Sequence, residues 1–152
     1  MLRKLRERIQ SEEKGFTLIE LLVVILIIGI LAAIAIPAFL GQRQKAQDSA
    51  AKSMSRNAAS AAAAFATDQG GSYNSPTTMT IGALQAIEPS LSDAGGVQSV
   101  TTLHGVAADA FTVSTESKSG KFYNLTRSGG NTYRCEAANA TTACAAASTP
   151  TW

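Results

Sequence analysis

The chain has 152 residues, of which 45% are hydrophobic and 16% are charged, and its formal net charge is +2. This length supports one modest domain beside a membrane segment, but not two. Residues 1–15 carry five basic and three acidic side chains, whereas the remaining residues carry eight of each. Because the charge after residue 15 is balanced, we expect no specific nucleic-acid-binding groove there.

An apolar run without ionisable side chains extends from Leu21 to Leu40, directly after Glu20. As a helix these residues are about 30 Å long, which matches the hydrocarbon core of a bilayer. A carboxylate next to hydrocarbon is costly, so Glu20 needs a partner. By the positive-inside rule, the basic residues before the run keep residues 1–15 in the cytoplasm, and the chain after Leu40 is expected to be exported.

This segment resembles the N-terminus of a type IV prepilin, a family of filament subunits that includes the pseudopilins of type II secretion. The resemblance rests on Lys14-Gly15, on Phe16, on Thr17-Leu18-Ile19-Glu20-Leu21-Leu22 and on the apolar run that is broken at Pro37. It implies that a membrane peptidase cuts between Gly15 and Phe16 and then methylates the new amine of Phe16. Glu20 would become the fifth residue of the mature protein.

Two other interpretations of the same residues stay open. The segment could be an ordinary secretory signal, with Ala33-Ile34-Ala35 as a small-residue cleavage site, or a plain N-terminal anchor. In the signal interpretation the charge of Glu20 has no explanation. Without assembly, Glu20 could extend to the headgroup level near the helix start, where it also faces the helix dipole favourably. The prepilin interpretation explains the charge, because an ionised carboxylate and the buried amine of a neighbouring Phe16 can compensate each other's charge in an apolar bundle.

The helix is predicted to continue beyond the membrane surface to about Gln69, and Gly70-Gly71 to end it. Pro37 is expected to cause a bend or a melted turn near residues 33–41. Asp48 and Lys52 are one turn apart and could form an ion pair. A stripe of mostly small side chains should lie against a sheet, and it consists of Ala50, Met54, Ala58, Ala61 and Phe65.

The second half of the chain is predicted to form a short helix and an antiparallel meander. The helix is expected at Ile81 to Ile87, with Thr80 as its N-cap. Alternating patterns predict strands at Val97–Leu103, Ala110–Thr115, Lys121–Thr126 and Thr132–Cys135. Tight hairpins are expected at Ser119-Gly120 and Ser128-Gly129-Gly130. The fold class is therefore α+β, with a long N-terminal helix packed on a sheet of three or four strands, as in pilins.

Four regions follow from these patterns together with the resemblance, which implies the cleavage of the leader. They are a cleaved cytoplasmic leader (1–15), a transmembrane or filament-core helix (16–40), the amphipathic half of that helix (41–69) and an exported globular region (70–152). The globular region contains the two cysteines, Cys135 and Cys144. In an exported domain these are expected to form a disulfide, which stabilises by roughly 2–3 kcal/mol. The alternative is two free thiols.

No enzyme chemistry, cofactor site or metal site is predicted. The one histidine, His104, is expected at the surface of a turn, and the acidic residues are scattered. The glycosylation triplets that begin at Asn124 and Asn139 are a pattern that arises often by chance. The residues with an expected role are Gly15 and Phe16 in processing, Glu20 in assembly, Pro37 in bending, and Cys135 and Cys144 in the disulfide.

The resemblance implies a subunit of a type IV pilus, used for attachment, motility or DNA uptake. The implied partners are other pilin subunits, the prepilin peptidase and methyltransferase, an inner-membrane platform protein and an assembly ATPase. The precursor would lie in the inner membrane with its N-terminus in the cytoplasm, and the assembled filament on the cell surface. Type II secretion pseudopilin and non-polymerising membrane-anchored binding module are the alternatives. The cysteine pair and the lack of carboxylate side chains from Ala137 to Trp152 favour the pilus.

Overall fold

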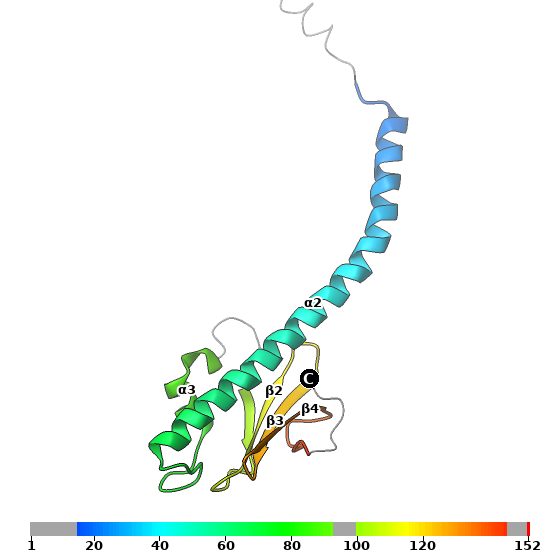
Figure 1. Ribbon diagram of the computed structural model, residues 1–152. Helices are drawn as coiled ribbons and strands as arrows, with labels where there is room; N and C mark the ends of the chain where they lie inside the picture. The colour runs from blue at the N-terminus through cyan, green and yellow to red at the C-terminus, as the bar shows by residue number, and fades with distance from the viewer. Residues whose placement is uncertain (1–14, 93–99, 146–151) are drawn as a thin grey trace, which may run out of the picture. The chain divides into compact units, whose positions relative to one another are not determined.

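The structure is a computed structural model that describes residues 15–92, 100–145 and 152. The chain divides into two compact units, Met1–Gly41 and Gln42–Trp152, and the helix α2, Leu18–Asp68, contributes to both (Figure 1). The other elements lie in the second unit. In chain order they are α3 (Ile81–Ile87), the 3-10 helix η1 (Pro89–Leu91), β1 (Val100–His104), β2 (Phe111–Glu116), β3 (Phe122–Ser128) and β4 (Asn131–Ala137).

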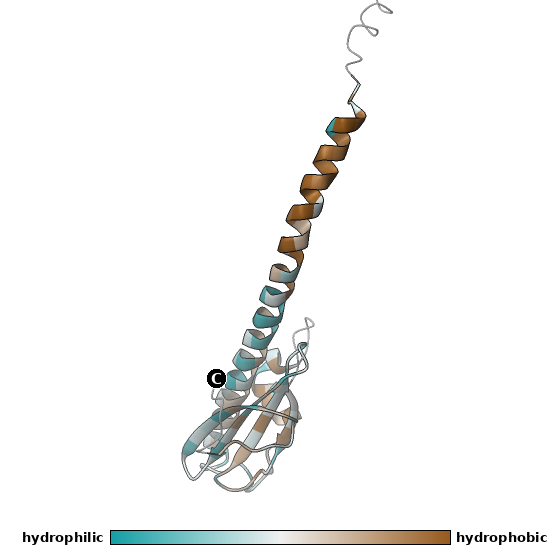
Figure 2. Cartoon of the chain, turned by 90° about the vertical axis from the view of Figure 1, so that its right-hand side faces the viewer, coloured by the Kyte–Doolittle hydropathy of each residue, from teal (hydrophilic) through white to brown (hydrophobic). Residues whose placement is uncertain are grey.

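In the first unit, α2 is apolar and its side chains are exposed. Figure 2 shows this apolar stretch in brown, followed by a hydrophilic stretch of the same helix in teal. Among the described residues, α2 is the one helix that is long and apolar enough to cross a membrane. Residues 33–41 are helical throughout, so the melted turn that was expected near Pro37 is absent from this structure. The bend at Pro37 stays a prediction.

The second unit is built around a four-stranded antiparallel sheet in the order β1-β2-β3-β4. The β3–β4 hairpin has the two-residue turn Gly129-Gly130, in which both residues have positive φ, at 56° and 80°. Such a turn suits the right-handed twist of the strands and favours glycine at both positions. The expected hairpins and the α+β class are confirmed.

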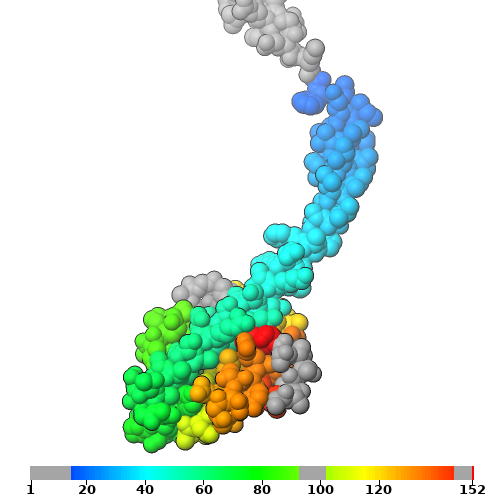
Figure 3. Space-filling view, viewed as in Figure 1, coloured from blue at the N-terminus to red at the C-terminus, as the bar shows by residue number. Residues whose placement is uncertain are grey.

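One face of the sheet packs against α2 and forms the hydrophobic core. Phe111, Val113 and Thr115 alternate along β2 on this face, as predicted, and all three are buried. Ser55 of α2 donates a hydrogen bond to the carbonyl oxygen of Tyr123 (2.9 Å), and its Oγ also lies 2.9 Å from Oγ1 of Thr115. The space-filling view shows the green segment around α3 on one side of α2 and the orange β4 on the other (Figure 3).

The stripe predicted on α2 is confirmed for three of its five residues. Ala58, Ala61 and Phe65 are buried as expected, but Ala50 and Met54 are only half-buried. The buried face also contains Ala51, Ser55, Ala62 and Ala66. The small side chains allow the helix backbone to approach the sheet closely, and a buried serine fits this face because its hydroxyl finds a partner on the sheet.

The other element predictions differ from the structure by one or two residues, except for α3 and for the start of β1. That helix has the predicted bounds, and Thr80 accepts a hydrogen bond from the backbone of Ala83 as its N-cap. α2 ends at Asp68, followed by Gly70 and Gly71 with positive φ. His104 is the last residue of β1 rather than part of the turn, and residues 97–99 of the first predicted strand lie outside the described residues.

Candidate functional site

The first turn of α2 contains a reciprocal cap formed by Thr17 and Glu20. The backbone N–H and the hydroxyl of Thr17 both donate to Oε2 of Glu20, at 2.8 and 2.6 Å. In return, the backbone N–H of Glu20 donates to Oγ1 of Thr17, at 3.2 Å. This capping box satisfies two of the backbone N–H groups that a helix start leaves without partners. The Thr-x-x-Glu spacing is the sequence signal for this box, and it gives Glu20 a capping role in addition to the role expected from its charge.

The residues just before this cap are exposed. The side chain of Phe16 is 90% exposed, and a Cβ atom added at Gly15 would meet nothing within 4 Å. Nothing in the described fold therefore requires glycine at position 15. A requirement for glycine there would come from a protein that recognises the segment, such as a processing enzyme.

A shallow apolar hollow lies along α2 below the capping box. Its lining residues recur at spacings of three and four, so they share one side of the helix: Leu22, Ile25, Leu26, Gly29, Ile30 and Ala33. Gly29 and Ala33 are small residues four apart, a spacing that lets two helices approach closely in an apolar environment. The hollow can accept the side chains of a neighbouring helix.

The structure brings the predicted site residues together in two separate groups. Gly15, Phe16 and Glu20 lie within one segment at the start of α2, and Pro37 lies further along the same helix. Cys135 and Cys144 form a disulfide in the second unit, with their Cα atoms 5.7 Å apart. In the part of the chain that the structure describes, no group of three or more histidine, cysteine or acidic side chains could hold a metal ion.

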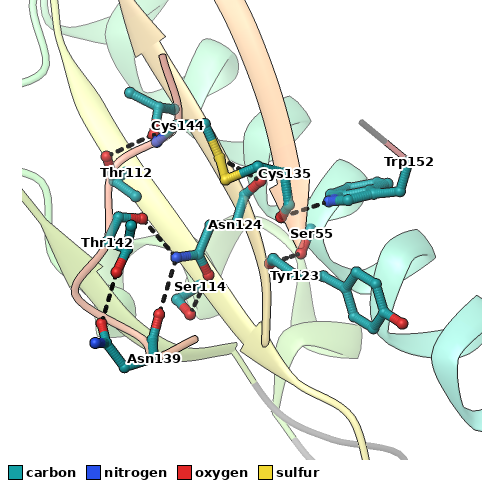
Figure 4. The surroundings of a disulfide bond; sticks show 11 residues. Ser55, Thr112, Ser114, Tyr123, Asn124, Cys135, Asn139, Thr142, Cys144 and Trp152 are labelled. Atoms are coloured by element: carbon teal, nitrogen blue, oxygen red, sulfur yellow. Dashed lines mark hydrogen bonds between the residues drawn. A yellow bond between two sulfur atoms is a disulfide. The ribbon is translucent and has the colours of Figure 1, made fainter. Parts of the chain in front are cut away.

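The disulfide loop covers a polar layer on the second face of the sheet, which sequence analysis did not predict. Figure 4 shows Asn124 between Ser114 and the loop residues Asn139 and Thr142. Its Nδ2 donates to the carbonyl oxygens of Thr142 (2.6 Å) and Asn139 (3.2 Å), and its Oδ1 accepts from Ser114 (2.6 Å). The backbone N–H of Cys144 donates to Thr126, at 2.8 Å.

Asn124 is completely buried, so it is not available for glycosylation in the folded protein. The triplet that begins at Asn124 therefore has a structural role. The one that begins at Asn139 is exposed, and the amide oxygen of Asn139 accepts hydrogen bonds from Thr141 and Thr142 within its own loop.

Asp48 joins α2 to the turn between β2 and β3, and it does so through hydroxyl groups rather than through Lys52. Ser117 donates to its carboxylate at 2.6 Å, and Ser119 donates to the same oxygen. Burial raises the pKa of Asp48, but hydrogen bonds from Ser117, Ser119 and Tyr123 and the charge of Lys121 outweigh it, so the pKa lies below its ordinary value. Lys52 lies over the ring of Tyr123 instead, 5.0 Å from its centroid.

Comparisons with known proteins find relatives of the N-terminal segment, which contains the capping box and the apolar helix. Residues 11–36 match the family model described as the prokaryotic N-terminal methylation motif. The chain is 40% identical over 97 residues to the type IV major pilin protein PilE1 of Neisseria gonorrhoeae, which covers 62% of this chain and 42% of that protein. It is also 44% identical over 62 residues to the fimbrial protein EcpC of Eikenella corrodens (41% and 40% covered).

A third relative, the type IV major pilin protein PilA of Myxococcus xanthus, is 53% identical over 45 residues, which cover 30% of this chain and 20% of that protein. The matches to these three proteins thus span about two fifths of the relatives' length or less. No solved structure matches the chain significantly.

Proposed function

We propose that this chain, whose N-terminal segment matches the methylation motif and is similar to type IV pilins, is a structural subunit of a type IV pilus. The observation that carries the proposal is the methylation motif over residues 11–36, which leads directly into an exposed apolar helix. The named relatives are pilins and fimbrial proteins, so the pseudopilin alternative is not favoured. The subunit is a building block and catalyses nothing itself.

Processing would occur at the exposed segment before α2. The prepilin peptidase cuts between Gly15 and Phe16, and the new amine of Phe16 is methylated. Before assembly, residues 16–40 anchor the subunit in the inner membrane, with residues 1–15 in the cytoplasm and the second unit exported. The peptidase, a platform protein and an assembly ATPase are the partners that this route requires.

Assembly would pair charges inside the filament core. The amine of Phe16 and the carboxylate of Glu20 are each costly in an apolar bundle, and they compensate each other when the amine of one subunit meets the carboxylate of its neighbour. The cap from Thr17 uses only Oε2 of Glu20, so Oε1 is the oxygen available for that amine. The hollow around Gly29 gives a neighbouring helix a place to pack.

The test compares filament assembly by Glu20→Ala with that by Asp68→Ala, which removes an exposed carboxylate from the last residue of α2. We expect Glu20→Ala to abolish sheared surface filaments while the processed subunit accumulates in the membrane, and Asp68→Ala to assemble normally. Mass spectrometry of wild-type filaments should give a subunit that starts at methylated Phe16 and contains the disulfide. Normal filaments from Glu20→Ala, or a subunit that still carries residues 1–15, would contradict the proposal.

A further inference from the structure

We propose that the start of the second unit carries a collar of basic side chains that binds anionic phospholipid headgroups while the subunit is anchored in the membrane. The collar consists of Arg43 and Lys45 on α2 and Lys118 in the turn between β2 and β3, and all three are exposed. The proposal rests on the membrane anchoring of the apolar helix. It does not depend on whether the subunit forms filaments.

The position of Arg43 and Lys45 along α2 matches the depth of the headgroups. They follow Leu40, the last residue of the apolar run, by three and five residues. In a helix this corresponds to about 5 and 8 Å beyond the hydrocarbon core, and the headgroup layer on each side of a bilayer is about 5–8 Å thick. The two residues are about 200° apart around the helix axis, so they lie on nearly opposite sides of the helix.

Lys118 is held at the same end of the second unit by Asp48. The residues on both sides of Lys118, Ser117 and Ser119, donate hydrogen bonds to the Asp48 carboxylate. Asp48 is eight residues beyond Leu40, or about 12 Å along the helix. Figure 1 shows the β2–β3 turn beside α2. A lysine side chain is long enough to reach the headgroups from here, in the way that lysines do at membrane interfaces.

The collar residues have no carboxylate partner in the described part of the chain, whereas the neighbouring basic residues are occupied. Lys121 pairs with Glu136 at 2.9 Å, and this is the one ion pair among the described residues. Lys52 and Arg56 lie over the rings of Tyr123 and Trp152. Of the nearby carboxylates, Asp48 accepts serine hydroxyls, Glu136 is paired with Lys121, and Glu116 at the end of β2 is half-buried.

The distribution of charge along the sequence also calls for an external partner. Arg43 and Lys45 are the first charged side chains after the apolar run, and no acidic side chain precedes Asp48, on the side of the membrane where basic residues are usually depleted. A basic cluster next to a membrane helix is attracted to anionic lipids at short range. Headgroup phosphates at this depth supply the negative charge that the fold does not.

The test measures which lipids surround the full chain in a membrane. The protein is reconstituted in vesicles that contain phosphatidylglycerol as a minority component in phosphatidylcholine, and it is excised with its nearest lipids in polymer-bounded nanodiscs. Mass spectrometry then gives the ratio of the two lipids. We expect phosphatidylglycerol to be enriched around the wild type and the enrichment to fall at least about fivefold when the three basic side chains of the collar are removed. Raised salt should reduce it, because exposed charges are screened.

The collar variant is Arg43→Gln/Lys45→Gln/Lys118→Gln. Its control is Arg56→Gln/Arg127→Gln/Arg134→Gln, which removes the same charge from guanidinium groups that lie over aromatic rings. Thermal unfolding verifies that both variants are folded.

The proposal is overturned if phosphatidylglycerol is not enriched around the wild type, or if the control loses as much enrichment as the collar variant. It is also overturned if the collar variant keeps its lipids but loses filaments, which would assign the collar to a second copy of the chain. Normal assembly by Glu20→Ala would contradict the pilus proposal and leave this measurement unaffected.

Discussion

Glu20 uses one carboxylate for two purposes, a local cap and the proposed contact with a neighbouring subunit. Thr17 directs two hydrogen bonds to Oε2 and thereby fixes the carboxylate at the start of α2. A negative charge at this end of a helix is favourable because it faces the positive end of the helix dipole. A fixed carboxylate presents its second oxygen in one direction, so Thr17 is a positioning residue for Glu20.

The substitution Thr17→Val removes the hydroxyl group and retains the size and charge of the segment. A lost cap costs about 1 kcal/mol, so the amide hydrogens of the first turn should exchange about fivefold faster with solvent. Hydrogen exchange of the full chain in detergent micelles, followed at Leu18 to Leu21, measures this. Thr17→Ser keeps a hydroxyl group and should exchange like the wild type. Equal exchange in all three proteins would show that the cap has no energetic role.

Asp48 gives the second unit a predictable dependence on pH. Its pKa in the folded protein is below its ordinary value of 3.8, because hydrogen bonds and the charge of Lys121 favour the ionised form. The folded state therefore binds this proton less readily than the unfolded state. The resulting contribution to the free energy of unfolding is fully present above the ordinary pKa and is lost as the pH falls through the folded pKa.

The substitution Asp48→Asn should lower the free energy of unfolding at pH 7 by about 1 kcal/mol, a modest value because the carboxylate is partly exposed. The difference from the wild type should shrink as the pH is lowered below the ordinary pKa, since the wild type then loses the same contribution. Denaturant unfolding of the full chain at several pH values measures both effects. Asp109→Asn, in the exposed turn before β2, is the control. A difference that stays constant with pH would contradict this account of Asp48.

At the scale of elements, the sheet has two different faces. The face toward α2 is apolar and packs against small helix side chains, whereas the opposite face carries a buried polar layer under the disulfide loop. Thr112, Ser114 and Asn124 are buried on this second face, and each has a hydrogen-bond partner there. The loop supplies two carbonyl oxygens to Asn124, Ser114 donates to the amide oxygen of Asn124, and the hydroxyl groups of Thr112 and Thr126 bond to each other. Two interactions therefore hold one loop: the disulfide between Cys135 and Cys144, and the hydrogen bonds of the Asn124 side chain.

Because these two interactions hold the same loop, the losses of stability on removing each of them should not be additive. Asn124→Ala leaves two loop carbonyl groups and the Ser114 hydroxyl without this partner and should cost about 2–3 kcal/mol. Cys135→Ala/Cys144→Ala should cost about the same. The combined variant should lose less than the sum, since a detached loop no longer needs Asn124. Denaturant midpoints of the four proteins give the interaction energy. Asn131→Ala, at the exposed start of β4, should change stability by less than about 0.5 kcal/mol.

Elements defined by neighbouring residues could be predicted, and contacts between distant segments could not. Thr80 and the residues after it contain their own start signal, and the glycines of the hairpins specify their turns, so α3 and the meander followed from the sequence. The contact of Asp48 with Ser119 joins residues 71 positions apart, and that of Asn124 with Thr142 joins strand to loop. Local spacing suggested Lys52 as the partner of Asp48, and it gave no role to Asn124, because spacing contains no information about which distant segments pack there.

For the molecule as a whole, the predicted orientation in the membrane is supported more by the N-terminal motif than by the distribution of basic residues. Five basic residues precede the apolar run and four follow it within residues 41–56. The positive-inside rule counts basic residues close to the membrane on both sides, so this difference favours a cytoplasmic N-terminus only weakly. The stronger argument is the processing proposed at Gly15 and Phe16, because a cytoplasmic leader would be required for it. The cytoplasmic N-terminus therefore stays a prediction.

The division of the chain into two compact units predicts that defects in one leave the other intact. Ala62 is completely buried against the sheet, so Ala62→Leu should overpack the core and lower the free energy of unfolding of the second unit by about 1–3 kcal/mol. Glu20→Ala should leave that free energy unchanged within about 0.5 kcal/mol. Denaturant unfolding of the full chain in micelles, followed by the fluorescence of Trp152, measures both.

The control for the core substitution is Ala63→Leu, which adds the same side chain at an exposed position of α2 and should have little effect. A double variant, Glu20→Ala/Ala62→Leu, should lose the same stability as Ala62→Leu alone, because the two sites share no packing partner. Carbonate extraction should leave both single variants in the membrane, since the apolar run is intact in each. If Glu20→Ala destabilised the second unit, a failure to form filaments could reflect misfolding, and its use as evidence for a charge contact between subunits would be lost.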